Sequence, residues 1–242
     1  MKFIVANREL LVPSPHCNIT RGVLRSLEPA RQVAPGVMTL LAQMLSKNSS
    51  KHHWFLPTTI TEIAISRAAI PHHTVAFIRE EFMGKADDVY MIYCPIFSDN
   101  HWILLLIDVL KEKLIYVDSL KRACMRARRR RLYKRVADFL EELMDEAGWY
   151  NDKPKQPLLI TDFKFLEPDV VEEDLGSGMF VAQWMIMYHL WGTFDVEKVT
   201  NYSRMRLAVD MVLKEHNESK LAFIDKALEY WRFFAHPNGG NP

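Results

Sequence analysis

The segment "WILLLI" at residues 102–107 is apolar at every position. A strand with one face in solvent alternates apolar and polar residues, so an unbroken apolar strand is expected to be buried on both faces. Helices must then cover the sheet on both sides. The neighbouring segments 88–98 and 113–120 are rich in Ile, Val, Tyr and Leu, which predicts further strands beside it, and "PLLITDFKFLE" at 157–167 predicts another.

A second apolar segment, "FVAQWMIMYHLW" at residues 180–191, is shorter than the roughly 18 apolar residues that a membrane-spanning helix needs. Because it is apolar nearly all round, we expect a buried central helix that begins near residue 179. The predicted fold class is therefore α/β (α+β), with a mixed or antiparallel central sheet. Further helices are predicted over 35–47, 56–66, 72–83, 126–147, 203–216 and 219–237.

Bulk composition excludes several classes of protein. With 242 residues, 49% of them hydrophobic, the chain can bury a full core as one domain over 1–242. A net charge of +1 provides no global field for nucleic acid or membrane, so neither is expected as a direct partner. The beginning of the chain lacks a signal-peptide pattern, and three cysteines without a CxxC spacing argue against a disulfide framework. We expect an intracellular protein.

Two polar residues stand at the ends of the predicted strands. His101 begins the apolar strand, and Asp118 follows the next one. If these strands form a hairpin around residues 109–112, antiparallel pairing brings the histidine and the carboxylate to one end of the sheet. A carboxylate there can fix the histidine tautomer and stabilise its protonated form, as in a catalytic site. Equally, they could be a strand-end histidine and a turn-capping aspartate.

Ser177 lies between Gly176 and Gly178 at the entry to the predicted central helix. Unpaired amides and the helix dipole make such a position suitable for an anion, and they lower the pKa of a thiol placed there. This position would favour a nucleophilic cysteine, but the residue present is serine. The alternative is a serine that caps the helix.

Taken together, these segments resemble a known family. "DNHWILLLIDVLKEKLIYVDSL" and "GSGMFVAQWM" are similar to the His-Trp, Asp-Ser-Leu and nucleophile blocks of the ubiquitin-like-modifier (SUMO) proteases, which are papain-like cysteine peptidases. The flanking segments look most like divergent plant members associated with transposable elements. The resemblance covers about residues 20–215 and leaves 216–242 as a C-terminal helical extension.

The resemblance implies a papain-like fold and a role for each matching residue. His101 would be the general base, Asp118 its orienting carboxylate and Ser177 the occupant of the nucleophile position. Trp102 would lie near the channel that accepts the modifier's Gly-Gly tail, and Gly176 and Gly178 would complete the substrate-binding set. The implied partner is a ubiquitin-like modifier or its conjugates, and no cofactor is implied.

The sequence departs from the family pattern in ways that weaken catalysis. Serine replaces the family's cysteine at 177, and the family's oxyanion glutamine, six residues before the nucleophile, is Val171 here. Losing one oxyanion donor typically costs about 2.7–4 kcal/mol of transition-state stabilisation. Where the family has an aspartate directly before the nucleophile, this sequence has Gly176. Asp174, two residues earlier, would be the displaced equivalent of that aspartate. We therefore expect a weakened or inactive hydrolase.

Three functions remain open at this stage. The first is a SUMO-type cysteine endopeptidase or isopeptidase-like protein, weakened by Ser177. Its alternative is a non-catalytic pseudoprotease that binds a modifier or serves as a transposon-derived nuclear scaffold. Acetyl transfer, known in bacterial relatives of the fold, has less support.

The sequence holds other reactive or charged residues. Cys94 and Cys124 are alternative thiols, but neither heads a helix that faces His101. The basic run 128–131 is either part of a solvated amphipathic helix or a nuclear-import signal, and it favours the nucleus over the cytoplasm. The paired histidines at 52–53 and 72–73 lack the i, i+4 spacing of helical metal ligands, so no metal is predicted.

Overall fold

A central sheet of five strands organises the computed structural model, which describes residues 7–14, 17–120, 123–145, 149–150, 158–172 and 176–235. The strands follow one another across the sheet in chain order: β3 (His53–Phe55), β4 (Met91–Ser98), β5 (His101–Asp108), β6 (Lys113–Val117) and β7 (Lys164–Leu166). The two outer pairs are parallel and the inner three strands are antiparallel. The prediction of a mixed sheet is confirmed.

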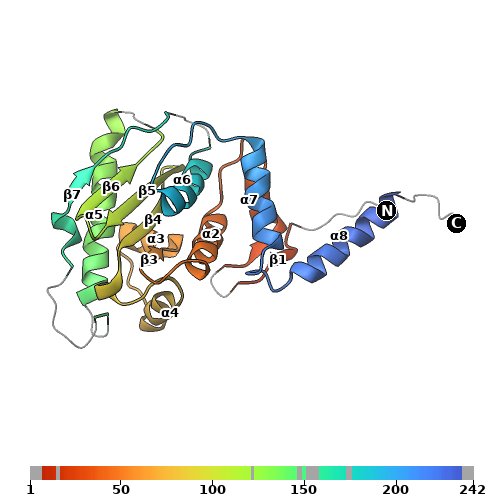
Figure 1. Cartoon of the computed structure of the whole chain (residues 1–242), viewed down its shortest axis with the longest axis horizontal. Helices are drawn as coiled ribbons and strands as arrows, with labels where there is room; N and C mark the ends of the chain where they lie inside the picture. Colours follow the sequence, from red (N-terminus) through yellow and green to blue (C-terminus); the bar gives the residue numbers. More distant parts are fainter. Residues whose placement is uncertain are drawn as a thin grey trace.

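Every residue of β5 is buried, as its unbroken apolar run predicts. In Figure 1 the sheet lies between α5 and α6, so helices cover both of its faces. The helices longer than one turn are α2 (Pro35–Lys47), α3 (Thr58–Ser66), α4 (His72–Phe82), α5 (Ala123–Asp145), α6 (Ser177–Trp191), α7 (Asn201–Leu213) and α8 (Lys220–Ala235). A short helix α1 (Arg21–Leu24) and a two-stranded sheet of β1 (Leu10–Val12) and β2 (Ile19–Thr20) precede them.

The β5–β6 hairpin turns where the sequence predicts. Leu104 pairs with Val117, and Asp108 pairs with Lys113, so the turn spans 109–112. The beginning of β5 and the residues just after β6 therefore meet at one end of the sheet. This arrangement brings His101 and Asp118 into the same region.

Helix α6 begins at Ser177, two residues before the predicted start. Its first half is buried against β5 and α2, but its last turn is not: Trp191 is 67% exposed. An apolar sequence alone therefore overstated how far the helix is enclosed. Its buried end is the one that carries Ser177.

Three short strands, β1, β2 and β3, were not predicted from the sequence. β3 begins at His53 and is held by parallel pairing with β4. The strand predicted over 157–167 is reduced to the three residues of β7, after a 3-10 turn at Ile160–Asp162. A strand of three residues is too short to show the alternation of apolar and polar residues by which a strand is located in a sequence.

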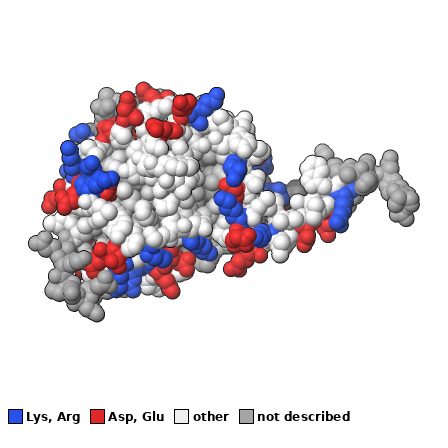
Figure 2. All heavy atoms as spheres, in the orientation of Figure 1, with Lys and Arg blue, Asp and Glu red and all other residues white. Residues whose placement is uncertain are grey.

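The C-terminal helices lie at the edge of the molecule. Helix α8 points away from the sheet, and the beginning of α8 contacts α7 (Figure 1). On the face seen in Figure 2, charged side chains gather toward the edges and uncharged atoms fill the centre, over α6. None of the helices in the described residues combines the length and the apolar character required to cross a membrane.

Candidate active site

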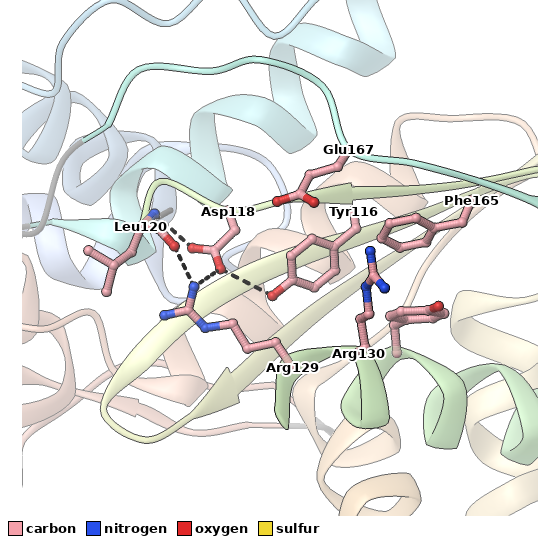
Figure 3. Close-up of a pocket in the computed structure, with 8 residues that line it drawn as sticks. Tyr116, Asp118, Leu120, Arg129, Arg130, Phe165 and Glu167 are labelled. Carbon is pink, nitrogen blue, oxygen red and sulfur yellow. Dashed lines mark hydrogen bonds and ion pairs between the residues drawn. The ribbon is translucent and has the colours of Figure 1, made fainter. Parts of the chain in front are cut away.

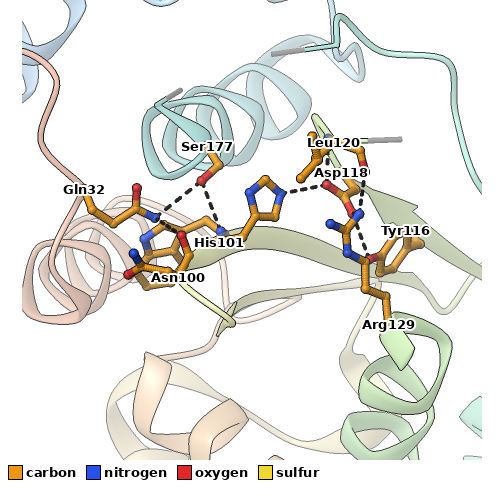
Figure 4. A network of polar contacts seen from close by, with 9 residues as sticks. Gln32, Asn100, His101, Tyr116, Asp118, Leu120, Arg129 and Ser177 are labelled. Atoms are coloured by element: carbon orange, nitrogen blue, oxygen red, sulfur yellow. Dashed lines mark hydrogen bonds and ion pairs between the residues drawn. The ribbon is translucent and has the colours of Figure 1, made fainter. Parts of the chain in front are cut away.

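His101 and Asp118 are in direct contact at the end of the β5–β6 hairpin. His101 Nε2 lies 2.8 Å from Asp118 Oδ1, and both residues are buried, at 8% and 6% exposure. Because Nε2 is bound to the carboxylate, Nδ1 is the ring nitrogen left on the side of Ser177 (Figure 4). The carboxylate thus fixes how the imidazole is turned.

Asp118 is itself held by three other groups. Its carboxylate accepts hydrogen bonds from Tyr116 Oη at 3.1 Å and from the Leu120 amide at 2.8 Å, and it forms an ion pair with Arg129 (Figure 4). Burial, aided by the Asp118 charge, raises the pKa of Tyr116, so its hydroxyl keeps the proton that it donates. The carboxylate is therefore fixed in position and compensated in charge.

Arg129 was missed as part of the site because it lies within the basic run 128–131. Its neighbours in that run are exposed, but Arg129 is only 6% exposed and faces the sheet. Arg128 pairs with Asp99 at 2.8 Å, and the Arg130 guanidinium lies over the ring of Phe165. The basic run is therefore not one continuous solvated patch.

Beyond Asp118, a small pocket opens between β6, β7 and α5. Figure 3 shows that it is lined by Tyr116, Asp118, Arg129, Phe165 and Glu167, among others. In Figure 4, Tyr116 and Arg129, which line this pocket, lie on the side of Asp118 away from Ser177. It borders the supporting groups of the site rather than its reactive end.

Ser177 is the first residue of α6, and its hydroxyl points out of the helix. Gly176 is the N-cap, with φ of +86°, a left-handed conformation that favours glycine. No side-chain cap hydrogen bond forms at this helix; instead Ser177 Oγ accepts hydrogen bonds from the Trp102 amide at 3.1 Å and from Gln32 Nε2 at 3.4 Å. The interpretation of Ser177 as a helix cap is therefore wrong.

Gly178 allows α6 to approach β5 closely. A Cβ atom on Gly178 would lie 2.6 Å from Val33 Cβ and 2.8 Å from Trp102 Cδ1, so no larger residue fits without movement. Trp102 is fully buried and donates from its indole to the Val33 carbonyl at 2.9 Å. The structure thus gives Trp102 and Gly178 packing roles, and their contact with a modifier tail stays a prediction.

The three sequence-predicted catalytic residues meet at one place. The imidazole of His101 lies between Ser177 and Asp118 in Figure 4. Within the described residues, no hydrogen bond joins Ser177 Oγ to the ring of His101; the hydroxyl oxygen instead accepts from the Trp102 amide and from Gln32.

Of the remaining candidate residues, Val171 and Cys94 can be placed. Val171 is 39% exposed, and Asp174 lies outside the described residues. Cys94 is fully buried in β4, where burial raises the pKa of its thiol, and the side chain of Cys124 is not among those described. No group of three or more metal-ligating side chains occurs in the described part of the chain.

The sequence profile of the Ulp1 protease family, C-terminal catalytic domain, matches residues 38–213. This match covers more than two thirds of the chain and ends with the last residue of α7. The chain therefore belongs to the Ulp1 protease family. No curated protein matches it in sequence.

Solved structures of SUMO proteases share the fold. The SUMO protease Ulp1 with its catalytic cysteine oxidised to a sulfinic acid has a TM-score of 0.65 at 18% identity, over 86% of this chain and 90% of that one. The C-terminal Ulp1 protease domain in complex with Smt3, the yeast ortholog of SUMO, gives 0.60 at 18%, over 84% and 86%. The Ulp1-like SUMO protease catalytic domain of Chaetomium thermophilum gives 0.55 at 12%, over 86% and 83%. The similarity to these protease structures confirms the predicted fold class.

Proposed function

We propose that the chain is a SUMO-type endopeptidase or isopeptidase-like domain in which Ser177 occupies the nucleophile position, so that bond cleavage is weak or absent. The observation that carries the proposal is the arrangement of three residues. A buried, carboxylate-oriented imidazole lies beside a hydroxyl at the N-terminus of the central helix. Family membership supports the same reaction class.

The chemistry that this arrangement supports is acyl transfer from the C-terminal glycine of a modifier. The atom at position 177 would bond to the carbonyl carbon while its proton moves to His101 Nδ1, and the C=O π electrons would move onto oxygen. Collapse would then break the C–N bond, with His101 returning the proton to the leaving amine. Water would release the acyl group from residue 177 by the same steps.

The serine hydroxyl limits this reaction. A cysteine can form a thiolate–imidazolium pair before substrate arrives, whereas serine must lose its proton during attack. In the resting structure Ser177 Oγ also accepts two hydrogen bonds, which leaves less of its electron density available to a carbonyl carbon. Binding of the modifier makes no such demand on residue 177.

That difference favours a second candidate, a non-catalytic pseudoprotease that binds a ubiquitin-like modifier or serves as a transposon-derived nuclear scaffold. The occupied hydroxyl and the absence of glutamine at position 171 both support it. A nuclear location rests on the basic run 128–131, from which the buried Arg129 must be discounted. A single domain over 1–242, with 216–242 as a helical extension, belongs to the same proposal.

Two measurements on the unaltered chain separate these candidates. Titration of SUMO and of ubiquitin into the protein, followed by calorimetry, tests binding. Incubation with a SUMO precursor that carries residues beyond Gly-Gly tests cleavage. Binding without cleavage supports the pseudoprotease, binding with slow cleavage supports the weakened protease, and neither binding nor cleavage would reject both.

A further inference from the structure

A glutamine from a distant part of the sequence reaches the candidate nucleophile. Gln32 precedes α2 and is 145 residues from Ser177, yet its Nε2 lies 3.4 Å from Ser177 Oγ. The same nitrogen lies 3.3 Å from the carbonyl oxygen of Asn100. A carbonyl oxygen can only accept, so the amide nitrogen of Gln32, and not its oxygen, must face this region.

The segment that carries Gln32 is held in place on both sides. The buried Arg204 donates to the Arg31 carbonyl at 3.0 Å, and the Trp102 indole donates to the Val33 carbonyl at 2.9 Å. The Val33 side chain occupies the space left by the missing Cβ of Gly178. The position of Gln32 beside Ser177 is therefore fixed by groups on β5, α6 and α7.

We propose that Gln32 supplies the oxyanion donor that is missing at position 171. This inference rests on the proposed function. In a tetrahedral intermediate the oxyanion is two bonds from the nucleophile atom, so a donor about 2.7–3.1 Å from the oxyanion also lies close to that atom. Gln32 Nε2 lies close to the nucleophile atom in this sense, at 3.4 Å from Ser177 Oγ. The Met179 and Phe180 amides already donate to the Gly176 carbonyl, so the amides of Ser177 and Gly178, the first two residues of α6, would complete the site.

The role of Gln32 changes during the reaction. In the resting state its amide N–H donates to Ser177 Oγ. When the nucleophile bonds to the carbonyl carbon, the negative charge moves from the nucleophile to the carbonyl oxygen, and the N–H would follow it. Gln32 would thus stabilise the transition state more than the bound substrate, which is the property of a catalytic group.

The test uses the full-length chain with Ser177→Cys as the parent, to which Gln32→Ala and Gln32→Glu are added. Glutamate has the shape of glutamine but lacks the N–H donors. Arg31→Ala is the matched control, because its side chain pairs with Glu28 in solvent and its backbone carbonyl is unchanged. Thermal unfolding of each variant verifies that it is folded.

Two readouts separate the oxyanion role from a general effect on the site. The first is the single-turnover rate of amide cleavage after Gly-Gly in a SUMO substrate. The second is covalent labelling by SUMO with a C-terminal alkyne, which a thiol attacks without forming an oxyanion. We expect Gln32→Ala and Gln32→Glu to slow cleavage by about 10²–10³-fold while alkyne labelling and the Arg31→Ala variant change little.

The possible results lead to different conclusions. Unchanged cleavage in Gln32→Ala would overturn the role of Gln32 and leave the proposed function intact. An equal loss of cleavage and labelling would also overturn it, because Gln32 would then shape the site and not stabilise an oxyanion. If the Ser177→Cys parent neither cleaves nor is labelled, the proposed function fails and this inference fails with it.

Discussion

The buried guanidinium of Arg129 on α5 is ion-paired with the Asp118 carboxylate, whose other oxygen holds His101 Nε2 at 2.8 Å. The Asp118 carboxylate therefore binds both the candidate general base, His101, and a cation on α5, which covers the face of the sheet opposite α6 (Figure 1). This pair joins the folding of α5 to the geometry of the site. It also means that removal of Arg129 would leave a buried negative charge.

Replacement of Arg129 with methionine is expected to cost about 3–5 kcal/mol of unfolding free energy, because breaking a buried pair leaves its partner uncompensated. The matched control is Arg128→Met on the same helix, whose pair with Asp99 is exposed and whose loss is expected to cost less than about 1 kcal/mol. Urea unfolding measures both. Equal costs for the two variants would show that Arg129 is not a structural partner of Asp118.

Gly178→Ala tests the close approach of α6 to β5. The added Cβ would lie 2.6 Å from Val33 Cβ, and overpacking of this kind typically costs about 1–3 kcal/mol. Gly36→Ala is a suitable control, because its nearest neighbour would be 3.3 Å away and alanine favours the helix in which it lies. Thermal unfolding should show a lower midpoint for Gly178→Ala alone. A stable Gly178→Ala variant would mean that this contact is loose.

Acidification is expected to destabilise the fold through His53 and His189, whose rings lie 4.9 Å apart. Burial lowers the pKa of both from the ordinary value near 6.5, and the charge of His189 further lowers the pKa of His53. Below pH 6.5 the unfolded chain therefore binds more protons than the folded chain, so stability decreases as pH falls through that window and is fully present above it.

The urea midpoint measured between pH 5 and pH 8 tests this prediction. Replacing His53 and His189 together with phenylalanine should flatten the dependence on pH, while His72→Gln, at an exposed position on α4, should leave it unchanged. Burial also lowers the pKa of His216, so a residual slope is expected. An unaltered slope in the double variant would assign the acid sensitivity elsewhere.

Much of the fold follows from local sequence patterns. The apolar run of β5, the polar turn after it and the proline at the beginning of α2 each determine an element from neighbouring residues. A hairpin that turns around residues 109–112 then places His101 and Asp118 at one end of the sheet. These features could be predicted because their causes lie within a few residues of one another.

The rest of the site depends on tertiary packing that local patterns do not encode. Arg129 looks like one of several solvated arginines until α5 is placed against the sheet. Gln32 reaches Ser177 because of contacts made by the next residue, Val33. The Trp102 indole donates to the Val33 carbonyl, and Gly178 leaves room for the Val33 side chain. Gln32 is 145 residues from Ser177, so the sequence around Ser177 gives no sign of it.

The central claim is that Ser177 occupies a nucleophile position served by His101. The most direct test is covalent labelling by SUMO with a C-terminal alkyne, followed by intact-protein mass spectrometry. We expect no adduct with the unaltered chain, a stoichiometric adduct with Ser177→Cys, and none when His101→Ala is added to that variant. A folded Ser177→Cys protein that forms no adduct, or one that reacts equally well without His101, would contradict the claim.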